Sequence, residues 1–289
     1  MAERASGVAE RPTPVAPPSP PGGTRGRRQH ALGRLRGDIP PSLQLGLGIF
    51  GMVLLFGGWA ITSAAMDSFL YPTPTATWDA AVELYRSGDL VTDMQASLTR
   101  VAIGYGASMA IGVVIGVLMG SFRSAEAVFE PQIGFLRYIP ATALTPLFLL
   151  WLGIEETPKI ALVLVGTVFY NILMVADVAR AVPKEQINAS YTLGARRLRV
   201  LGRVILPHSY PGIIDVARIN LAAAWLMLVV AELLAAEEGL AYRIARATRG
   251  RQVDRMFALL IVFGLIGLLS DVALRQLRRR TAPWSEGSR

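Results

Sequence analysis

The sequence predicts an all-α integral membrane protein with about six transmembrane helices and with both termini in the cytoplasm. Hydrophobic residues make up 52% of the 289 residues and charged residues only 17%, whereas soluble domains usually carry about 25% charged residues. The apolar residues form long uncharged runs, and a helix needs about 20 such residues to cross the bilayer core. Lys and Arg gather in alternate loops between these runs, as the positive-inside rule requires.

Composition also excludes several classes of function. The chain has no cysteine and two histidines, so we expect no disulfide framework, no thiolate or polyhistidine metal site and no bound cofactor. A G-x-x-x-x-G-K-[ST] phosphate loop is absent from the sequence, so the chain is not expected to be an enzyme that hydrolyses ATP. The net charge of +8 does not indicate nucleic-acid binding, because the basic residues lie between apolar runs.

The first 40 residues differ from the rest of the chain. The stretch 12–23 is rich in proline, which prevents packing into a core, and arginines occur before and after it. No short apolar segment begins near residue 10, as a signal peptide would require. We interpret residues 1–40 as a disordered, Pro/Arg-rich cytoplasmic tail.

The membrane domain is expected over residues 41–280, with a short cytoplasmic tail at 281–289. Its predicted spans are 43–66, 100–122, 131–154, 158–178, 212–236 and 256–277. The last two reach spanning length only if charged residues lie in or near the membrane, where they usually face a bundle interior. Asp215 with Arg218, and Asp271 with Arg275, have the spacing of pairs on one helix face.

Two features of the spans predict how they pack. Gly112 and Gly116, with Gly120 at the same spacing, let helix backbones approach closely; the contact lies either within the bundle or with a second copy. Pro140 and Pro146 should kink or break the third span. Backbone carbonyls freed in this way are tolerated where they are buried or line a cavity, so both prolines are candidates for the solute path.

The distribution of basic residues sets the orientation. The N-terminal tail, the loop 180–210 and the C-terminal end carry more than twice as many Lys and Arg as the other side of the membrane. The positive-inside rule therefore places both termini and the loop 180–210 in the cytoplasm of a multi-pass membrane protein.

The first outer loop is expected to contain a short helix. Residues 71–74 read Tyr-Pro-Thr-Pro and are extended. Trp78, Ala81, Val82 and Tyr85 then follow at helical spacing, and Gly88 should end this helix. We expect it to pack on the outer face of the bundle.

The second outer loop carries a run of arginines. Arg243, Arg246 and Arg249 are spaced by three, which aligns them on a helical face, and such a face could attract a small anion. The alternative is an acidic partner protein or lipid head groups. Glu232 lies beside this loop; it is either a gate or solute-path residue, or the water-exposed outer end of the fifth span.

The loop 180–210 holds the most informative motif. Its core places Asn188, Ala189 and Ser190 before Gly194, and Leu206-Pro207 follows. Local physics predicts a short helix with a glycine C-cap at Gly194, then a basic amphipathic segment that Pro207 stops. Such a loop either fixes topology only or presents a small-residue helix face to another protein.

The spacing in this loop resembles the EAA motif of permease subunits of bacterial binding-protein-dependent ABC importers. Asn188, Ala189 and Ser190 stand at the Glu-Ala-Ala positions, and Gly194 keeps the spacing of the motif glycine. Val204 takes the place of the usual isoleucine before Leu206-Pro207. Residues 97–100 with the glycines of the second span, 70–74, and 135–140 with 151–154 are similar to the nitrate, sulfonate, taurine and bicarbonate branch.

The resemblance implies an ABC importer permease-like bundle whose loop helix docks onto separate cytoplasmic ATPase subunits. It further implies a second permease copy, most simply in a homodimer, and an extracytoplasmic solute-binding protein, with ATP used by the partner subunit. The transported solute would be a small anion such as nitrate, a sulfonate, taurine or bicarbonate, moved by alternating access. An autonomous channel or secondary transporter is the alternative, although no internal repeat is evident.

Overall fold

A computed structural model describes residues 40–66 and 70–284. The expected tails at 1–40 and 281–289 therefore fall mostly outside the described residues. The chain divides into two compact units, 1–57 and 58–289, which are described separately. All the regular structure of the described residues is helical, and five helices, or six if one bent pair is a single span, are long and apolar enough to cross a membrane.

Helix α1 runs from Pro41 to Met66 without a charged residue. In the first unit its side chains from 45 to 56 are almost all exposed, as expected for a helix that faces lipid. The second unit begins inside this helix, and there Trp59 stacks on Phe257 with ring centroids 5.8 Å apart. The indole Nε1 of Trp59 also donates to the carbonyl of Pro72 at 3.1 Å.

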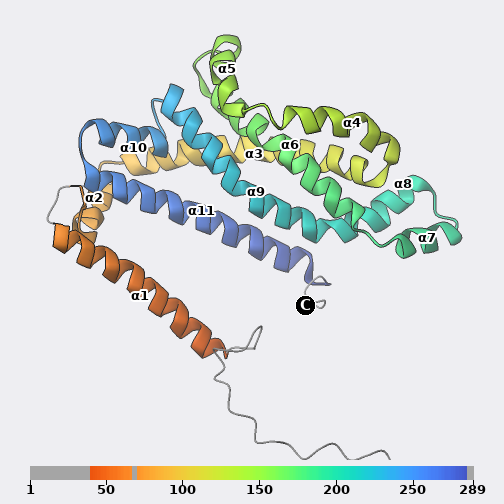
Figure 1. Cartoon of the computed structure of the whole chain (residues 1–289), viewed down its shortest axis with the longest axis horizontal. Coiled ribbons are helices and arrows are strands. Elements are labelled where there is room, and N and C mark those ends of the chain that lie inside the picture. Colours follow the sequence, from red (N-terminus) through yellow and green to blue (C-terminus); the bar gives the residue numbers. More distant parts are fainter. Residues whose placement is uncertain (1–39, 67–69, 285–289) are drawn as a thin grey trace, which may run out of the picture. The chain divides into compact units, whose positions relative to one another are not determined.

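The second unit continues as a bundle of long helices with short helices at its two ends (Figure 1). Figure 1 places α2 and α10 at one end of this unit, and α7 and α8 at the other. The elements, in order, are α2 (Pro74–Arg86), α3 (Asp89–Ser121), α4 (Arg123–Leu136), η2 (Ala141–Leu144), α5 (Thr145–Leu152), α6 (Glu156–Arg180), α7 (Lys184–Thr192), α8 (Arg197–Val200), η3 (Leu201–Ile205), α9 (Leu206–Ala235), α10 (Leu240–Arg249) and α11 (Val253–Thr281).

Helices α3 and α6 pack closely along much of their length because glycines of α3 face α6. A Cβ atom on Gly112 would lie 2.8 Å from the Cβ of Asn171. One on Gly116 would lie 2.6 Å from the carbonyl oxygen of Ile172, and one on Gly120 2.5 Å from that of Ala176. The glycine row therefore serves packing within the bundle, and its alternative assignment to a contact between two copies is wrong.

A buried chain of polar side chains joins α3, α6 and α9. The hydroxyl of Thr167 donates to that of Ser108 at 2.8 Å, and the amide of Asn171 donates to the same hydroxyl at 2.8 Å. Asn220 of α9 in turn donates to Asn171 Oδ1 at 2.7 Å. Such bonds between apolar helices fix their register, because a buried polar group without a partner is costly.

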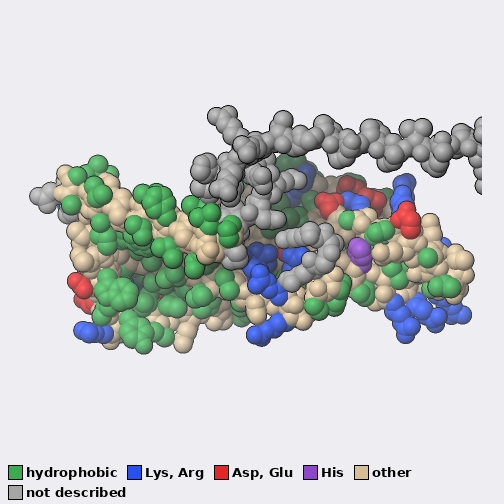
Figure 2. All heavy atoms as spheres, turned by 90° about the horizontal axis from the view of Figure 1, so that it is seen from below, with side chains coloured by type: hydrophobic (Ala, Val, Ile, Leu, Met, Phe, Trp, Pro, Cys, Tyr) green, Lys and Arg blue, Asp and Glu red, His purple; other side chains and the backbone are tan. Residues whose placement is uncertain are grey.

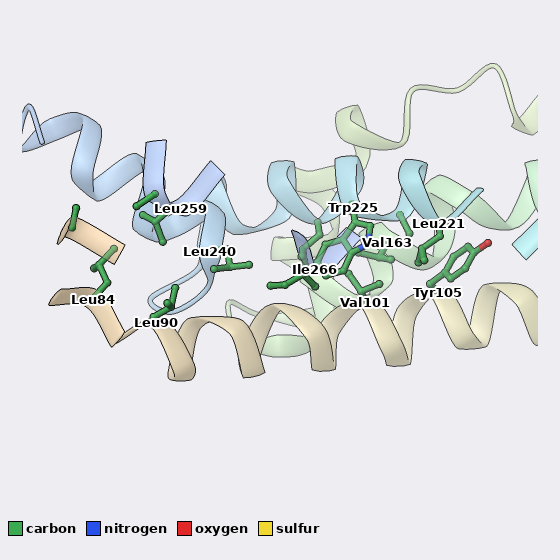
Figure 3. Packing of buried hydrophobic residues seen from close by; sticks show 14 residues of the cluster. Leu84, Leu90, Val101, Tyr105, Val163, Leu221, Trp225, Leu240, Leu259 and Ile266 are labelled. Atoms are coloured by element: carbon green, nitrogen blue, oxygen red, sulfur yellow. The ribbon is translucent and has the colours of Figure 1, made fainter. Parts of the chain in front are cut away.

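The largest hydrophobic cluster of the described residues lies among α2, α3, α6, α9, α10 and α11 (Figure 3). Trp225 of α9 packs edge-on against Phe263 of α11, with ring centroids 5.2 Å apart. Leu84 of α2 and Leu240 of α10 extend the cluster to the end of the bundle. This core holds both short helices on the spanning helices.

The predicted break in the third span is confirmed. Helix α4 and the pair η2–α5 meet at a bend of 76°, and the break includes Pro140, which precedes η2. Pro146 lies in the first turn of α5, where its missing N–H costs no helical hydrogen bond. The expected start near Pro131 was too late, because α4 begins at Arg123 and contains Pro131 in its interior.

Helix α2 confirms the predicted short helix, but its buried residues are not the aromatic ones that indicated it. Thr77, Ala80 and Leu84 are buried, whereas Trp78 and Tyr85 are 71% and 66% exposed. Hydrophobic spacing alone cannot tell which apolar stripe of a short helix meets the bundle. Here the small side chain of Ala80 allows the close contact, and the two aromatic rings lie outside it.

The segment after Gly194 also differs from expectation. Pro207 does not stop a helix, because α8, the π-helical turn η3 and α9 run on as one helical stretch from Arg197 to Leu234. Pro207 lies in the first turn of α9, directly after η3. A π-helical turn changes the backbone hydrogen-bonding pattern, and this position tolerates a residue without an N–H.

Candidate functional site: the α7–α8 surface and an outer charge network

Helix α7 ends in the glycine cap that the sequence predicted. Gly194 has a left-handed φ of 78°. Its N–H donates to the carbonyl of Tyr191 at 2.9 Å, and the N–H of Ala195 donates to that of Ser190 at 3.0 Å. These two bonds form a Schellman motif, so the chain turns sharply from α7 into α8.

The α7–α8 segment presents both apolar and basic side chains to its surroundings. Leu193 is 88% exposed and Leu198 is 78% exposed. On the face drawn in Figure 2, Lys and Arg side chains gather at the end where Figure 1 places α7 and α8. Four arginines of this segment are exposed and have no ion-pair partner among the described residues: Arg196, Arg197, Arg199 and Arg203.

The motif residues divide between this surface and its support. Asn188 and Ala189 are exposed and Ser190 is partly exposed on α7, next to the exposed Gly194. Leu206 and Pro207 are exposed in the first turn of α9. Beneath them, a cluster built on Ala179, Val182, Val200 and Ile205 packs the loop onto the end of α6 and the start of α9.

The helix that follows this surface is longer than the bilayer core is thick. The helical stretch from Arg197 to Leu234 contains 38 residues, about 57 Å at about 1.5 Å per residue, whereas the hydrocarbon core is about 30 Å thick. Its α8 end carries Arg197, Arg199 and Arg203, which would be costly among lipid tails. This end of the stretch therefore suits water rather than lipid.

A network of ion pairs joins α9 to α11 on the α8 side of the bundle. The predicted pairs are confirmed: Arg218 Nη1 lies 3.2 Å from Asp215, and Arg275 Nη2 lies 2.6 Å from Asp271. Arg218 Nε also reaches Asp271 at 2.9 Å, and Arg278 reaches Asp215 at 2.8 Å. The sequence suggested pairs within one helix, whereas the structure also links the two helices.

Glu232 lies in the interior of the protein. Its carboxylate accepts hydrogen bonds from Ser97 Oγ at 2.7 Å, from Arg100 Nη1 at 2.8 Å and from the backbone N–H of Ala241 at 2.9 Å. The residue is 1% exposed. Its interpretation as the water-exposed end of the fifth span is therefore wrong, because the turn before α10 folds over it.

Arg100 connects Glu232 to α6. The Nε and Nη2 atoms of Arg100 donate to the two carboxylate oxygens of Glu156 at 2.5 and 2.9 Å. Lys159 Nζ donates to Glu156 at 2.9 Å, and Arg100 Nη1 also donates to the carbonyl of Glu238 at 2.7 Å. One guanidinium on α3 thus holds the start of α6, the end of α9 and the turn before α10.

Arg243 is not free to attract a solute. Its Nε donates to the fully buried Asp93 at 2.5 Å, and its Nη2 lies 3.1 Å from Asp89. Burial lowers the pKa of the Arg243 guanidinium, but the hydrogen bond to Asp93 and the charges of both carboxylates outweigh it, so the pKa lies above its usual value. Arg246 and Arg249 on the same helix are exposed.

The sequence analysis did not identify the α3 residues that organise this network. Asp93, Ser97 and Arg100 follow one another at spacings of four and three, which places them on one helix face. That face receives the backbone N–H groups of Gly239 and Leu240, on Asp93 and Ser97 respectively. The repeat of polar side chains on one face, at the start of a span, could have indicated that this face meets other polar groups.

Comparison with known proteins identifies the family. Residues 112–283 match the family described as binding-protein-dependent transport system inner membrane component. The chain is 36% identical over 242 residues to a protein of Brucella abortus (strain 2308) named as an ABC transporter permease; the match covers 84% of this chain and 96% of that protein.

Two further relatives carry names that include a solute. The aliphatic sulfonates transport permease SsuC of Bacillus subtilis (strain 168) is 32% identical, with 90% of each chain covered. The taurine transport permease TauC of Escherichia coli (strain K12) is 33% identical, with 87% of this chain and 94% of TauC covered.

Solved structures share the fold. An inward-facing MetNI methionine ABC transporter chain superposes with a TM-score of 0.59 at 21% identity, over 67% of this chain and 96% of that one. A chain of a bacterial importer of the acidic polysaccharide alginate gives 0.58 at 13% identity, over 83% and 98%. These structures show the fold, and the family match with the permease relatives excludes the alternative of an autonomous channel or secondary transporter. The chain is a multi-pass inner-membrane permease subunit, not itself an ATPase, and it belongs to the binding-protein-dependent transport system inner membrane component family.

Proposed function

We propose that this permease forms the path for a small solute with an anionic group, of the sulfonate or taurine type, and works by alternating access driven by a separate ATPase. The observation that supports coupling to an ATPase is the α7–α8 surface, where Leu193 and Leu198 are exposed among arginines. Exposed apolar side chains in water favour a protein partner. The names of two relatives support the solute class.

In this proposal α7 docks into a groove of the ATPase. The small side chains of Ala189 and Ser190, with Asn188 beside them and Gly194 at the turn, allow the close approach of a partner surface. Because the loop packs onto α6 and α9 through its own buried cluster, a movement of the docked helix is passed to two spanning helices. Leu206 and Pro207 lie at the start of α9, where this movement enters the span.

On the solute side, we assign the attraction of anions to Arg246 and Arg249. Both are exposed, whereas Arg243 holds α10 against α3. The break at Pro140, followed by Pro146, leaves non-helical backbone in the third span, which suits the wall of a polar path. Glu232 acts on that path indirectly, by fixing the outer ends of α3 and α9. A second identical copy would complete the path.

The decisive experiment is purification of the tagged chain from its native membrane in mild detergent, with co-purifying proteins identified by mass spectrometry. A phosphate-loop ATPase recovered in near one-to-one amount with the wild type is the expected result. The variant Leu193→Glu should lose the ATPase, because a charge would enter the apolar contact. Tyr85→Glu, at an exposed position on the short helix α2, serves as the control. Retention of the ATPase by Leu193→Glu would overturn the docking assignment.

A further inference from the structure

A polar pocket of 480 Å³ opens on the side of the bundle that carries α10. It lies among the start of α6, the end of α9 and the turn that follows α5. Its charged lining residues are Arg100, Lys159, Glu155, Glu156, Glu237 and Glu238. The pocket includes neither the α7–α8 surface nor the exposed Arg246 and Arg249 of α10.

The charges in this pocket are separated by depth. The two cations are deep, since Arg100 is 3% exposed and Lys159 is 5% exposed. Glu155, Glu237 and Glu238 are exposed at the opening. The carboxylates of these three residues have no ion-pair partner within 40–66 and 70–284. A molecule that enters therefore meets negative charge first and positive charge at the bottom.

Glu156 lies between these two layers. Its carboxylate accepts hydrogen bonds from both deep cations, yet its side chain is 53% exposed. The charge of Arg100 is already matched by the fully buried Glu232 at 2.8 Å. Lys159 has three N–H donors, and one of them is used by Glu156. Glu156 is thus the partner that can leave without stranding Arg100 without a counter-charge.

We propose that this pocket binds a short zwitterion, an amino-sulfonate or amino-carboxylate. The anionic group replaces the carboxylate of Glu156 at Lys159 and Arg100, and the ammonium group lies against the carboxylates at the opening. Glu156 is then an internal substitute for the anionic group of the solute. The proposal deepens the proposed function, on which it rests, by naming a class of solute.

This arrangement of charges favours the binding of zwitterions over that of plain anions or plain cations. A plain anion satisfies Lys159 but passes three carboxylates without compensation, and like charges repel at short range. A plain cation is attracted by the opening but leaves the deep cations with Glu156. A zwitterion makes favourable contacts both with the carboxylates at the opening and with the cations at the bottom. Because it must displace Glu156, its affinity is low, as suits a site that a solute passes through.

Calorimetric titration of the purified chain in lipid nanodiscs tests the proposal. The probes are 2-aminoethanesulfonate and ethanesulfonate, which differ by one ammonium group. We expect the wild type to bind the aminosulfonate at least about tenfold more tightly than the plain sulfonate, which corresponds to one or two charge-assisted hydrogen bonds. Equal binding of the two probes would overturn the proposal.

Three variants locate the site. Glu156→Gln should bind both probes about tenfold more tightly, because the competing carboxylate is removed. The double variant Glu237→Gln/Glu238→Gln, at exposed positions, should lose most of the preference for the aminosulfonate over ethanesulfonate, because two of the three carboxylates at the opening are removed. Lys159→Met should bind neither probe. Glu130→Gln, at an exposed position on α4, is the control and should match the wild type. Unchanged affinities in Glu156→Gln would overturn the proposal.

These outcomes are separable from a failure of the proposed function. Co-purification of the ATPase depends on α7 and α8, at the other end of the second unit (Figure 1). A wild type that recovers its ATPase but binds both probes equally would overturn only the zwitterion site. If Lys159→Met fails to fold, the exposed double variant still decides the question.

Discussion

The guanidinium of Arg100 on α3 donates to the carboxylate of Glu232 on α9 at 2.8 Å, with the two side chains 3% and 0% exposed. The pair is separated by 132 positions in sequence, so only the folded bundle can form it. Ser97 and the N–H of Ala241 complete the bonds of the carboxylate. A buried pair that is fully hydrogen-bonded is tolerated, whereas one that loses a partner is not.

Removal of one member of this pair should be strongly destabilising. Glu232→Gln leaves Arg100 without its buried counter-charge, and we expect a loss of about 3–5 kcal/mol in the free energy of unfolding. Thermal unfolding in detergent measures it. The matched control is Glu83→Gln, which breaks the exposed pair with Arg255 and should cost at most about 1 kcal/mol. Equal losses of unfolding free energy in the two variants would show that the buried ion pair adds no more stability than the exposed one.

The glycine row of α3 gives a second prediction. Gly116→Ala should lower the free energy of unfolding by about 1–3 kcal/mol, because the new Cβ would lie 2.6 Å from the carbonyl oxygen of Ile172. Gly106→Ala on the same helix has open space around its Cβ and should be neutral or slightly stabilising. The comparison isolates packing against α6 from helix propensity. A Gly116→Ala variant as stable as the wild type would contradict the close α3–α6 contact.

The long apolar runs were sufficient to predict the all-helical membrane fold, because an uncharged run of about 20 residues has few alternatives. The cap at Gly194 was predictable as well, since a left-handed residue after a short helix favours glycine. Contacts between distant segments were not predictable. The exposure of Glu232 depends on how the turn before α10 folds, and the neutralisation of Arg243 depends on Asp93, 150 positions away.

The turn after α7 leads to a third prediction. Gly194→Val places a β-branched residue at a φ of 78°, which costs about 1–2 kcal/mol locally, so α7 should turn away from its position. The variant should insert in the membrane and keep its unfolding temperature, yet lose the co-purifying ATPase. Gly202→Val is the control, because Gly202 has helical φ and open space. Loss of the ATPase in both variants would point to a general effect of bulk in this loop.

The arginines of α10 should separate into two functional classes. Arg246→Gln with Arg249→Gln should lower uptake of a sulfonate by reconstituted importer several-fold at low salt, and the difference should shrink as salt screens the charges. Stability should be unchanged, because both side chains are exposed. Arg243→Gln should instead lower the unfolding temperature, since it leaves the buried Asp93 without its cation. Uptake by the double variant that equals the wild type at every salt concentration would remove the assignment of anion attraction to α10.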